Sequence, residues 1–180
     1  PVAFSLDYNV SGDDRTGTAG ESDMEEAVIT YTINDNLSVS AGRMLSYLGF
    51  EAYDAPNMYQ ISTAYVTGYA GYHYDGYADG VSIDYGNDTF SIGVWAGLEE
   101  ESSFEYAFAY TGVENLTAKY IFADYGSDSD ESKETLWLSY QMDKLLIAGE
   151  IAKWEEIANT STDSSEAGST VSITVSTAGS

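Results

Sequence analysis

The sequence of 180 residues contains no cysteine, only two prolines and a single histidine. Without cysteine, neither a disulfide framework nor a thiolate metal site is available. No run of about 18 apolar residues occurs, which excludes a membrane-spanning helix. No glycine-rich loop leads from a strand into a helix, and no serine nucleophile stands in a recognisable setting. The sequence therefore predicts neither nucleotide binding nor covalent catalysis.

Basic residues are also scarce. There are 6 lysines and arginines against 30 aspartates and glutamates, so the formal net charge is -24. A chain this acidic would repel nucleic-acid phosphates, which excludes DNA and RNA as partners. It would attract cations instead, in a pore or in acidic loops. Adaptation to salty surroundings is the alternative explanation.

What the chain does contain is apolar residues at every second position. In residues 1–10, Val2, Phe4 and Leu6 share one parity, and Ser5 and Asp7 share the other. A strand places successive side chains on opposite faces, so each such segment has one apolar and one polar face. The pattern returns about ten times in segments of about ten residues, enough for a tilted strand to cross a bilayer. We therefore predict an all-β fold, an antiparallel up-and-down meander forming a transmembrane β-barrel whose polar face lines water.

The connections between these segments alternate in length. Short connections are expected near 35, 87, 115 and 143, and longer ones near 15, 60, 101, 129 and 162. Most of the acidic residues fall in the longer group. A barrel with tight turns at one end and elaborated loops at the other has this arrangement. The longest irregular stretch is expected over residues 43–79, within a single domain or fragment spanning 1–180.

Two neighbouring segments carry motifs that are more specific than the alternation pattern. Residues 31–43 end a hairpin in Ala-Gly-Arg, and residues 49–57 follow with a glycine, an acid and an Asp-Ala-Pro element. This sequence resembles Gram-negative outer-membrane porins of the β-barrel porin-2 type. The resemblance implies that the loop after Arg43 folds into the barrel and narrows it, with Arg43, Glu51 and Asp54 at the constriction.

The resemblance also implies which partners the protein has and how long a complete porin of this type is. The partners would be outer-membrane lipid and lipopolysaccharide, small hydrophilic solutes or cations, and two further copies in a homotrimer. Porins of this kind are usually longer and end in an aromatic residue, whereas residues 176–180 are Ser-Thr-Ala-Gly-Ser. We therefore expect part of a larger porin barrel, while a complete ten-stranded barrel stays open.

Charged residues on the polar parity form the predicted lumen. They are Asp7, Asp84, Glu105, Lys119 and Glu150. A charge facing lipid is costly, about 2–4 kcal/mol for a basic residue at the midplane, so these side chains should face water. Rings of acids select cations, which predicts a cation-preferring pore. A water-filled barrel that tolerates such charges without selecting ions is the alternative.

Two other sites are weaker candidates. Asp124, Asp128 and Asp130 come nearest to a calcium cluster, but their spacing is not that of an EF-hand, which favours a solvated acidic loop. His73 and Asp75 invite comparison with outer-membrane proteases, since a histidine beside an aspartate can act as a general base. The tyrosine-rich surroundings of His73 favour loop packing instead.

We therefore predict a porin for passive diffusion of small hydrophilic solutes, in the bacterial outer membrane, with no enzymatic activity and no cofactor. Three alternatives stay open. The apolar faces could meet between two sheets of a soluble or surface-exposed β-sandwich, acting in binding or adhesion. The barrel could be structural with a blocked lumen, or it could be an outer-membrane protease.

Overall fold

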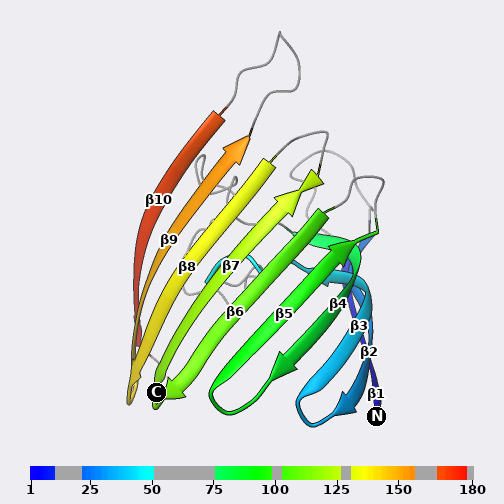
Figure 1. Cartoon of the computed structure of the whole chain (residues 1–180), viewed down its shortest axis with the longest axis horizontal. Helices are drawn as coiled ribbons and strands as arrows, with labels where there is room; N and C mark the ends of the chain where they lie inside the picture. Colours follow the sequence, from blue (N-terminus) through cyan, green and yellow to red (C-terminus); the bar gives the residue numbers. More distant parts are fainter. Residues whose placement is uncertain (11–21, 51–75, 99–102, 127–130, 157–165, 178–180) are drawn as a thin grey trace.

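A computed structural model of the chain describes residues 1–10, 22–50, 76–98, 103–126, 131–156 and 166–177. Ten β-strands make up nearly all of these ranges (Figure 1). Within them, no helix has the length and apolar character needed to cross a membrane. The strands are β1 (Val2–Val10), β2 (Ser22–Asn34), β3 (Leu37–Leu45), β4 (Tyr77–Gly86), β5 (Phe90–Gly97), β6 (Ser103–Val113), β7 (Leu116–Tyr125), β8 (Glu131–Met142), β9 (Leu145–Glu156) and β10 (Glu166–Thr177).

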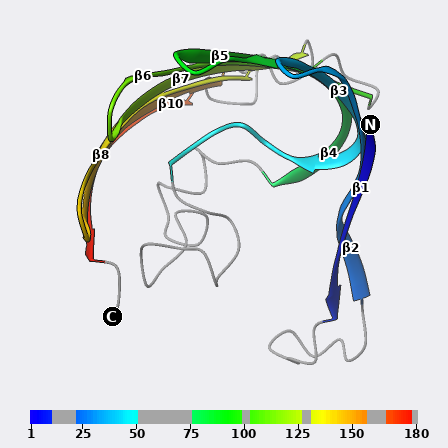
Figure 2. The ribbon, with the colours of Figure 1, turned by 90° about the horizontal axis from the view of Figure 1, so that it is seen from below.

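All ten strands belong to one sheet, in which each strand pairs antiparallel with the next one along the chain. The predicted antiparallel meander is therefore confirmed. In the described residues no ladder joins β1 to β10, and the sheet curves as an open arch (Figure 2). The right-handed twist and coiling of neighbouring strands account for a curved sheet of this kind.

The short hairpins fall where the sequence predicted them. Asn115 and Asp143 adopt positive φ angles of 63° and 49°, the left-handed conformation that asparagine and aspartate tolerate best. The turns also bond to one another: the Asn36 side chain donates to the Gly86 carbonyl at 2.6 Å, and the Thr111 amide donates to the Thr89 carbonyl at 2.7 Å. Hydrogen bonds thus link neighbouring short turns along this end of the sheet.

Several strands extend farther than the alternation of apolar and polar residues indicated. The second strand begins at Ser22, although its regular apolar–polar alternation starts only at Ala27, and a register shift after Asp7 explains the difference. A bulge adds one residue to one strand, so it breaks the alternation on which the prediction rested. The third strand ends at Leu45 and the fourth begins at Tyr77, so the two ends of the stretch expected over 43–79 belong to strands.

The two faces of the sheet differ in the way that the alternation predicted. The outer face exposes large apolar side chains from every strand except β3, among them Phe4 (65% exposed), Phe108 (47%) and Leu138 (51%). In a β-sandwich these side chains would be buried together between two layers. In the described residues they belong to one sheet and nothing covers them, which argues against the sandwich alternative.

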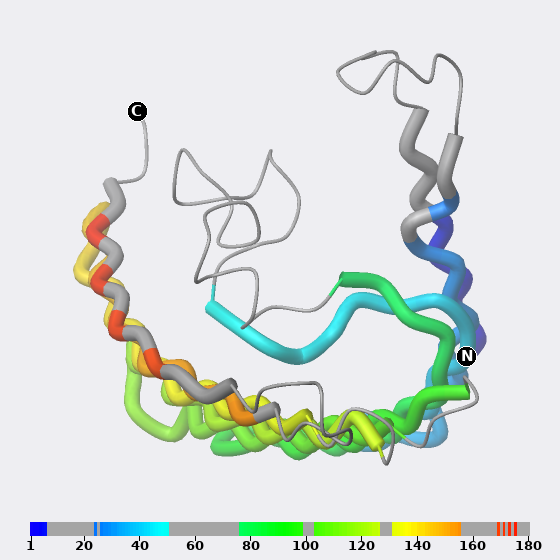
Figure 3. The backbone as a smooth tube through the Cα atoms, turned by 90° about the horizontal axis from the view of Figure 1, so that it is seen from above, coloured from blue at the N-terminus to red at the C-terminus, as the bar shows by residue number. Residues whose placement is uncertain are grey.

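The inner face is polar and partly covered. Its rows include Asp84, Glu105 and Glu150, and also Trp95 and Trp154, which are 6% and 7% exposed. Residues 46–50 cross the inside of the arch, seen as the cyan segment in Figure 3. The best-buried cluster of the molecule therefore lies between this segment and the sheet.

Candidate functional site

The site is built where residues 46–50, called here the inserted segment, meet the inner face. The segment leaves β3 after Leu45, and the Ser46 amide donates to the Gly76 carbonyl at 3.1 Å, just before β4 begins. The Ser46 hydroxyl accepts a hydrogen bond from the Leu48 amide at 3.1 Å. These two bonds fix the direction in which the chain turns into the arch.

Tyr47 makes the most contacts with the sheet. Its amide donates to Oε2 of Glu105 at 2.6 Å, and its hydroxyl donates to Oδ1 of Asp84 at 2.6 Å. The Lys119 ammonium lies 3.5 Å from the Tyr47 carbonyl oxygen and 5.5 Å from the centre of its ring. One residue of the inserted segment is thus held by side chains from β4, β6 and β7.

The hydroxyl of Tyr47 stays neutral over the physiological range. Burial raises its pKa far above the ordinary tyrosine value of 10.0, and the hydrogen bond to Asp84 raises it further. A neutral hydroxyl can donate to the Asp84 carboxylate, whereas a phenolate would repel it. The contact between Tyr47 and Asp84 is therefore stable except at strongly alkaline pH.

A glycine makes room for this contact. A Cβ atom added to Gly93 would lie 2.8 Å from Oδ1 of Asp84 and 2.9 Å from the Tyr47 ring, closer than carbon atoms approach one another. Asp84 is oriented from its other side by the Ser82 hydroxyl, which donates to Oδ2 at 2.8 Å. The position of Tyr47 thus requires a residue without a side chain at Gly93, and it requires that Ser82 holds the Asp84 carboxylate in place.

The far end of the inserted segment is held in the same way. The Phe50 amide donates to Oε1 of Glu150 at 3.1 Å, and the Phe50 ring meets Trp137 edge-on at 5.1 Å. Glu105, which holds Tyr47, also accepts a hydrogen bond from the Tyr125 hydroxyl at 3.0 Å. Hydrogen bonds from backbone amides to carboxylates are among the stronger hydrogen bonds, so both glutamates act as anchors.

An apolar contact lies between these polar anchors. Leu48 packs against Ala107, Ile121 and Ala123 on β6 and β7, and Ile121 and Ala123 are fully buried. The small alanines leave space that the leucine fills. Polar bonds at both ends and apolar packing in the middle together fix the inserted segment on the sheet.

Four of the five predicted lumen charges lie on this inner face. Asp84, Glu105 and Glu150 accept hydrogen bonds from the inserted segment, and Lys119 lies beside it. For Asp7 the structure describes only the backbone, which pairs with Glu26. The effect of these charges on permeating ions stays a prediction. The alternation pattern did not predict that backbone amides of residues 47 and 50 would bond to Glu105 and Glu150.

Of the three residues predicted at the constriction, the structure describes only Arg43. Arg43 belongs to β3 and not to the loop, and it shares the register rows of Ala27 and Asp79 on the outer parity. Its guanidinium lies 3.8 Å from the Asp79 carboxylate. Glu51 and Asp54 lie outside the described residues. In the described part, Tyr47, Leu48 and Phe50 are the loop residues inside the arch.

Most of the remaining candidate residues lie outside the part of the chain that the structure describes. Asp124 is exposed on β7, and Asp128 and Asp130 lie outside the described residues, as do His73 and Asp75. In the part of the chain that the structure describes, no three histidine or acidic side chains gather closely enough to hold a metal ion.

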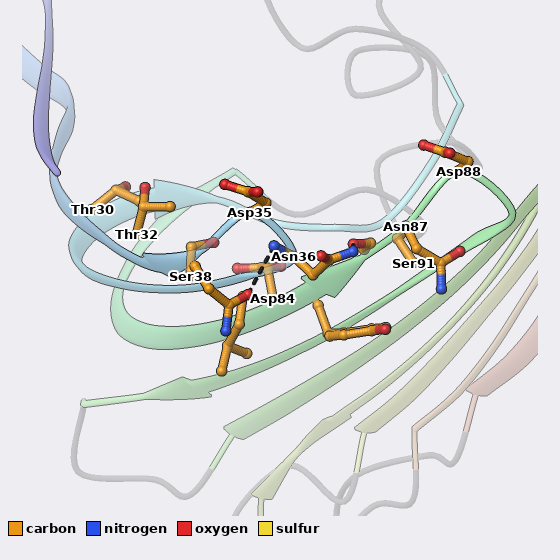
Figure 4. Close-up of a pocket in the computed structure, with 13 residues that line it drawn as sticks. Thr30, Thr32, Asp35, Asn36, Ser38, Asp84, Asn87, Asp88 and Ser91 are labelled. Atoms are coloured by element: carbon orange, nitrogen blue, oxygen red, sulfur yellow. Dashed lines mark hydrogen bonds between the residues drawn. The ribbon is translucent and has the colours of Figure 1, made fainter.

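A second polar space opens at the end of the sheet where the short turns lie. This short-turn hollow has a volume of about 730 Å³. Figure 4 shows Asp35, Asp84 and Asp88 around it, together with threonine, serine and asparagine side chains. Its described lining contains no lysine or arginine. Asp84 is shared by the hollow and the Tyr47 contact, so the two spaces are neighbours.

Comparison with known proteins agrees with this architecture. Neither the curated proteins nor the solved structures contained a match. A family model described as "Putative beta-barrel porin-2, OmpL-like" matches residues 4–141, which include nearly all of β1 to β8. The match includes the inserted segment and three of its anchors, Asp84, Glu105 and Lys119. The chain, with its single meander, apolar outer face and polar inner face, belongs to this β-barrel porin family.

Proposed function

We propose that the protein is an outer-membrane porin through which small hydrophilic solutes diffuse passively, with a preference for cations. The observation that supports this function best is the contrast between the two faces of one sheet. Large apolar side chains are exposed on the outer face of nine of the ten strands, and Asp84, Glu105, Lys119 and Glu150 lie on the inner face. A sheet that separates lipid from water gives the apolar side chains a hydrocarbon environment and the charged side chains an aqueous one.

The preference for cations is supported by the short-turn hollow. Asp35, Asp84 and Asp88 face a space without a described basic side chain, so the local potential is negative. Low-dielectric walls strengthen such a potential and raise the local concentration of cations. The overall charge of -24 acts in the same direction.

The inserted segment sets the width of the pathway in this proposal. Because Tyr47, Leu48 and Phe50 are bonded or packed onto the inner face, they occupy space that an empty arch would leave to water. A fixed segment gives a constant pore width, whereas a loose one would give a fluctuating width. The carboxylates Glu105 and Glu150 therefore act mainly as anchors, and the aspartates of the hollow act on ions.

Planar bilayer recording tests this function directly. We expect discrete conductance steps in potassium chloride and, in a salt gradient, a reversal potential displaced toward that of potassium. The double variant Asp35→Asn/Asp88→Asn should lower the cation preference. The double variant Glu114→Gln/Asp143→Asn removes two exposed turn acids outside the hollow and serves as the matched control.

The possible results separate the parts of the proposal. Absence of conductance steps from correctly folded protein would leave a structural barrel with a blocked lumen. Steps with equal permeability for potassium and chloride would retain the porin and remove the cation preference. Solubility of the folded protein in plain buffer would favour the sandwich alternative instead.

A further inference from the structure

A pocket of about 260 Å³ opens on the inner face, on the side of the inserted segment that faces the long connections. Its described lining includes Met44, Ala78, Trp95, Ser103, Glu105 and Tyr125. Tyr47 bonds to Glu105 of this pocket and to Asp84 of the short-turn hollow, so it stands between the two spaces. The pocket and the hollow share no lining residue.

Two glycines allow the Trp95 indole to lie against the sheet beside this pocket. Gly80 and Gly97 pair in register on β4 and β5. A Cβ atom at Gly80 would lie 2.1 Å from Nε1 of Trp95, and one at Gly97 would lie 3.1 Å from its Cη2. The indole edge from Nε1 to Cη2 therefore occupies space that side chains would otherwise fill. A larger residue at Gly80 would displace the ring.

The pocket combines polar groups of opposite hydrogen-bonding capacity. Glu105 is 2% exposed and only accepts hydrogen bonds, from the Tyr47 amide at 2.6 Å and from the Tyr125 hydroxyl at 3.0 Å. Trp95 is 6% exposed, and its Nε1–H only donates and has no acceptor among the described residues. The Ser103 hydroxyl can do both. A ligand that suits this lining carries donors and acceptors together.

The charges around the pocket narrow the choice of ligand further. Its described lining contains no lysine or arginine, and Lys133, which lies 5.2 Å from the Tyr125 ring, is paired with Glu131 at 3.1 Å. An anion would thus meet the Glu105 carboxylate with no cation of the lining to balance it. A quaternary ammonium could face Glu105 and the aromatic rings, but it offers no acceptor to the Trp95 N–H. Neutral hydroxyl groups suit both residues.

We propose that this pocket binds one neutral monosaccharide on its way through the pore. The sugar hydroxyls donate to Glu105 and accept from Nε1 of Trp95, and the C–H face of the sugar ring lies on Met44, Ala78 and the indole. The volume is just below the roughly 300–1,000 Å³ of sites for drug-sized ligands, which suits one sugar ring and not a longer saccharide. Because the sugar reaches the pocket from water inside the arch, the site rests on the proposed function.

Isothermal titration calorimetry of the full chain in detergent tests the site with three probes. They are D-glucose, D-glucuronate, which carries a carboxylate on the same ring, and tetramethylammonium. We expect glucose to bind with a dissociation constant on the order of 1 mM, as is usual for a ligand of this size. Glucuronate and tetramethylammonium should bind at least about tenfold more weakly, the first through repulsion by Glu105 and the second through its lack of hydrogen bonds.

Two variants with matched controls locate the site. Trp95→Phe keeps an aromatic ring but removes the N–H donor, and Trp154→Phe makes the same change at a buried tryptophan outside the lining. Ala78→Leu fills the pocket, and Ala41→Leu adds the same side chain to the exposed outer face of β3. We expect Trp95→Phe to weaken glucose binding about fivefold, Ala78→Leu to abolish it, and both controls to leave it unchanged.

Three results would overturn the sugar site. They are tighter binding of tetramethylammonium than of glucose, equal binding of glucuronate and glucose, and unchanged glucose binding in both Trp95→Phe and Ala78→Leu. Bilayer recordings on the same preparation keep the two proposals apart, since bound glucose should lower the open-channel current with a half-effect near its dissociation constant. A conducting channel that binds no glucose refutes only the sugar site, whereas a glucose-binding protein without conductance steps refutes the porin.

Discussion

The hydroxyl of Tyr47 donates a 2.6 Å hydrogen bond to the carboxylate of Asp84, directly over Gly93. The two residues lie 37 positions apart, one in the inserted segment and one on β4. Asp84 also faces the short-turn hollow. This contact thus joins the inserted segment to Asp84, which also belongs to the proposed ion pathway.

Removing the Tyr47 hydroxyl should loosen the inserted segment. Tyr47→Phe leaves the ring in place but takes one hydrogen bond from Asp84, which costs about 1 kcal/mol. We expect faster amide hydrogen exchange at residues 47–50 and noisier open-channel current. Tyr31→Phe, at an exposed tyrosine of the outer face outside the hollow, is the control. Equal exchange in both variants would show that this bond does not hold the segment.

Filling the space at Gly93 should have a larger effect than removing the hydroxyl. A valine there would collide with both the Asp84 carboxylate and the Tyr47 ring, so Tyr47 must leave its seat. We expect a larger single-channel conductance and loss of exchange protection at residues 47–50. Ala41→Val, at an exposed position on the outer face of β3, is the control because it enlarges a side chain away from both the inserted segment and the short-turn hollow. Unchanged conductance in Gly93→Val would contradict the proposed role of the segment.

Replacing Glu105 distinguishes an anchor from an ion-selecting charge. Glu105→Gln retains an acceptor for the Tyr47 amide but loses the charge, which weakens the anchor by about 1 kcal/mol. If Glu105 is an anchor, conductance and its noise change more than the reversal potential does. The opposite result, a shifted reversal potential at unchanged conductance, would make Glu105 a selectivity residue. Glu114→Gln changes an exposed turn acid and controls for net charge.

The raised pKa of Tyr47 predicts a specific alkaline transition. Because the folded-state pKa lies above the ordinary value of 10.0, the protonated hydroxyl is favoured in the folded protein. Its contribution to stability is complete below pH 10 and is lost as the pH rises through the folded-state pKa. The absorbance titration of wild type minus Tyr47→Phe should therefore show one tyrosine ionising well above pH 10. A difference curve centred at pH 10 would place the hydroxyl in water.

The sequence predicted the faces of the sheet better than their contacts. Period-two alternation predicted that Asp84 and Glu105 lie inside, because the parity of a side chain is a local property of a strand. The partner of Glu105 could not be predicted in this way, since the Tyr47 amide lies 58 residues earlier in an irregular segment. Every residue except proline has a backbone amide, so the residue type at position 47 does not reveal this donor. The need for Gly93 has the same origin, because only the folded chain brings Tyr47 over it.

If the outer face contacts lipid, a lysine introduced there should impair folding into a membrane. Phe108 is half exposed near the middle of β6, so Phe108→Lys should place a charge in hydrocarbon at a cost of about 2–4 kcal/mol. Ser38→Lys adds the same side chain to the short-turn hollow beside Asp84, where water and a carboxylate are available. We expect Phe108→Lys to reduce folding into lipid vesicles strongly, measured by protease protection, and Ser38→Lys to fold normally. In a soluble protein an exposed phenylalanine can become lysine at almost no cost, so equal folding of the two variants would mean that the outer face does not contact lipid.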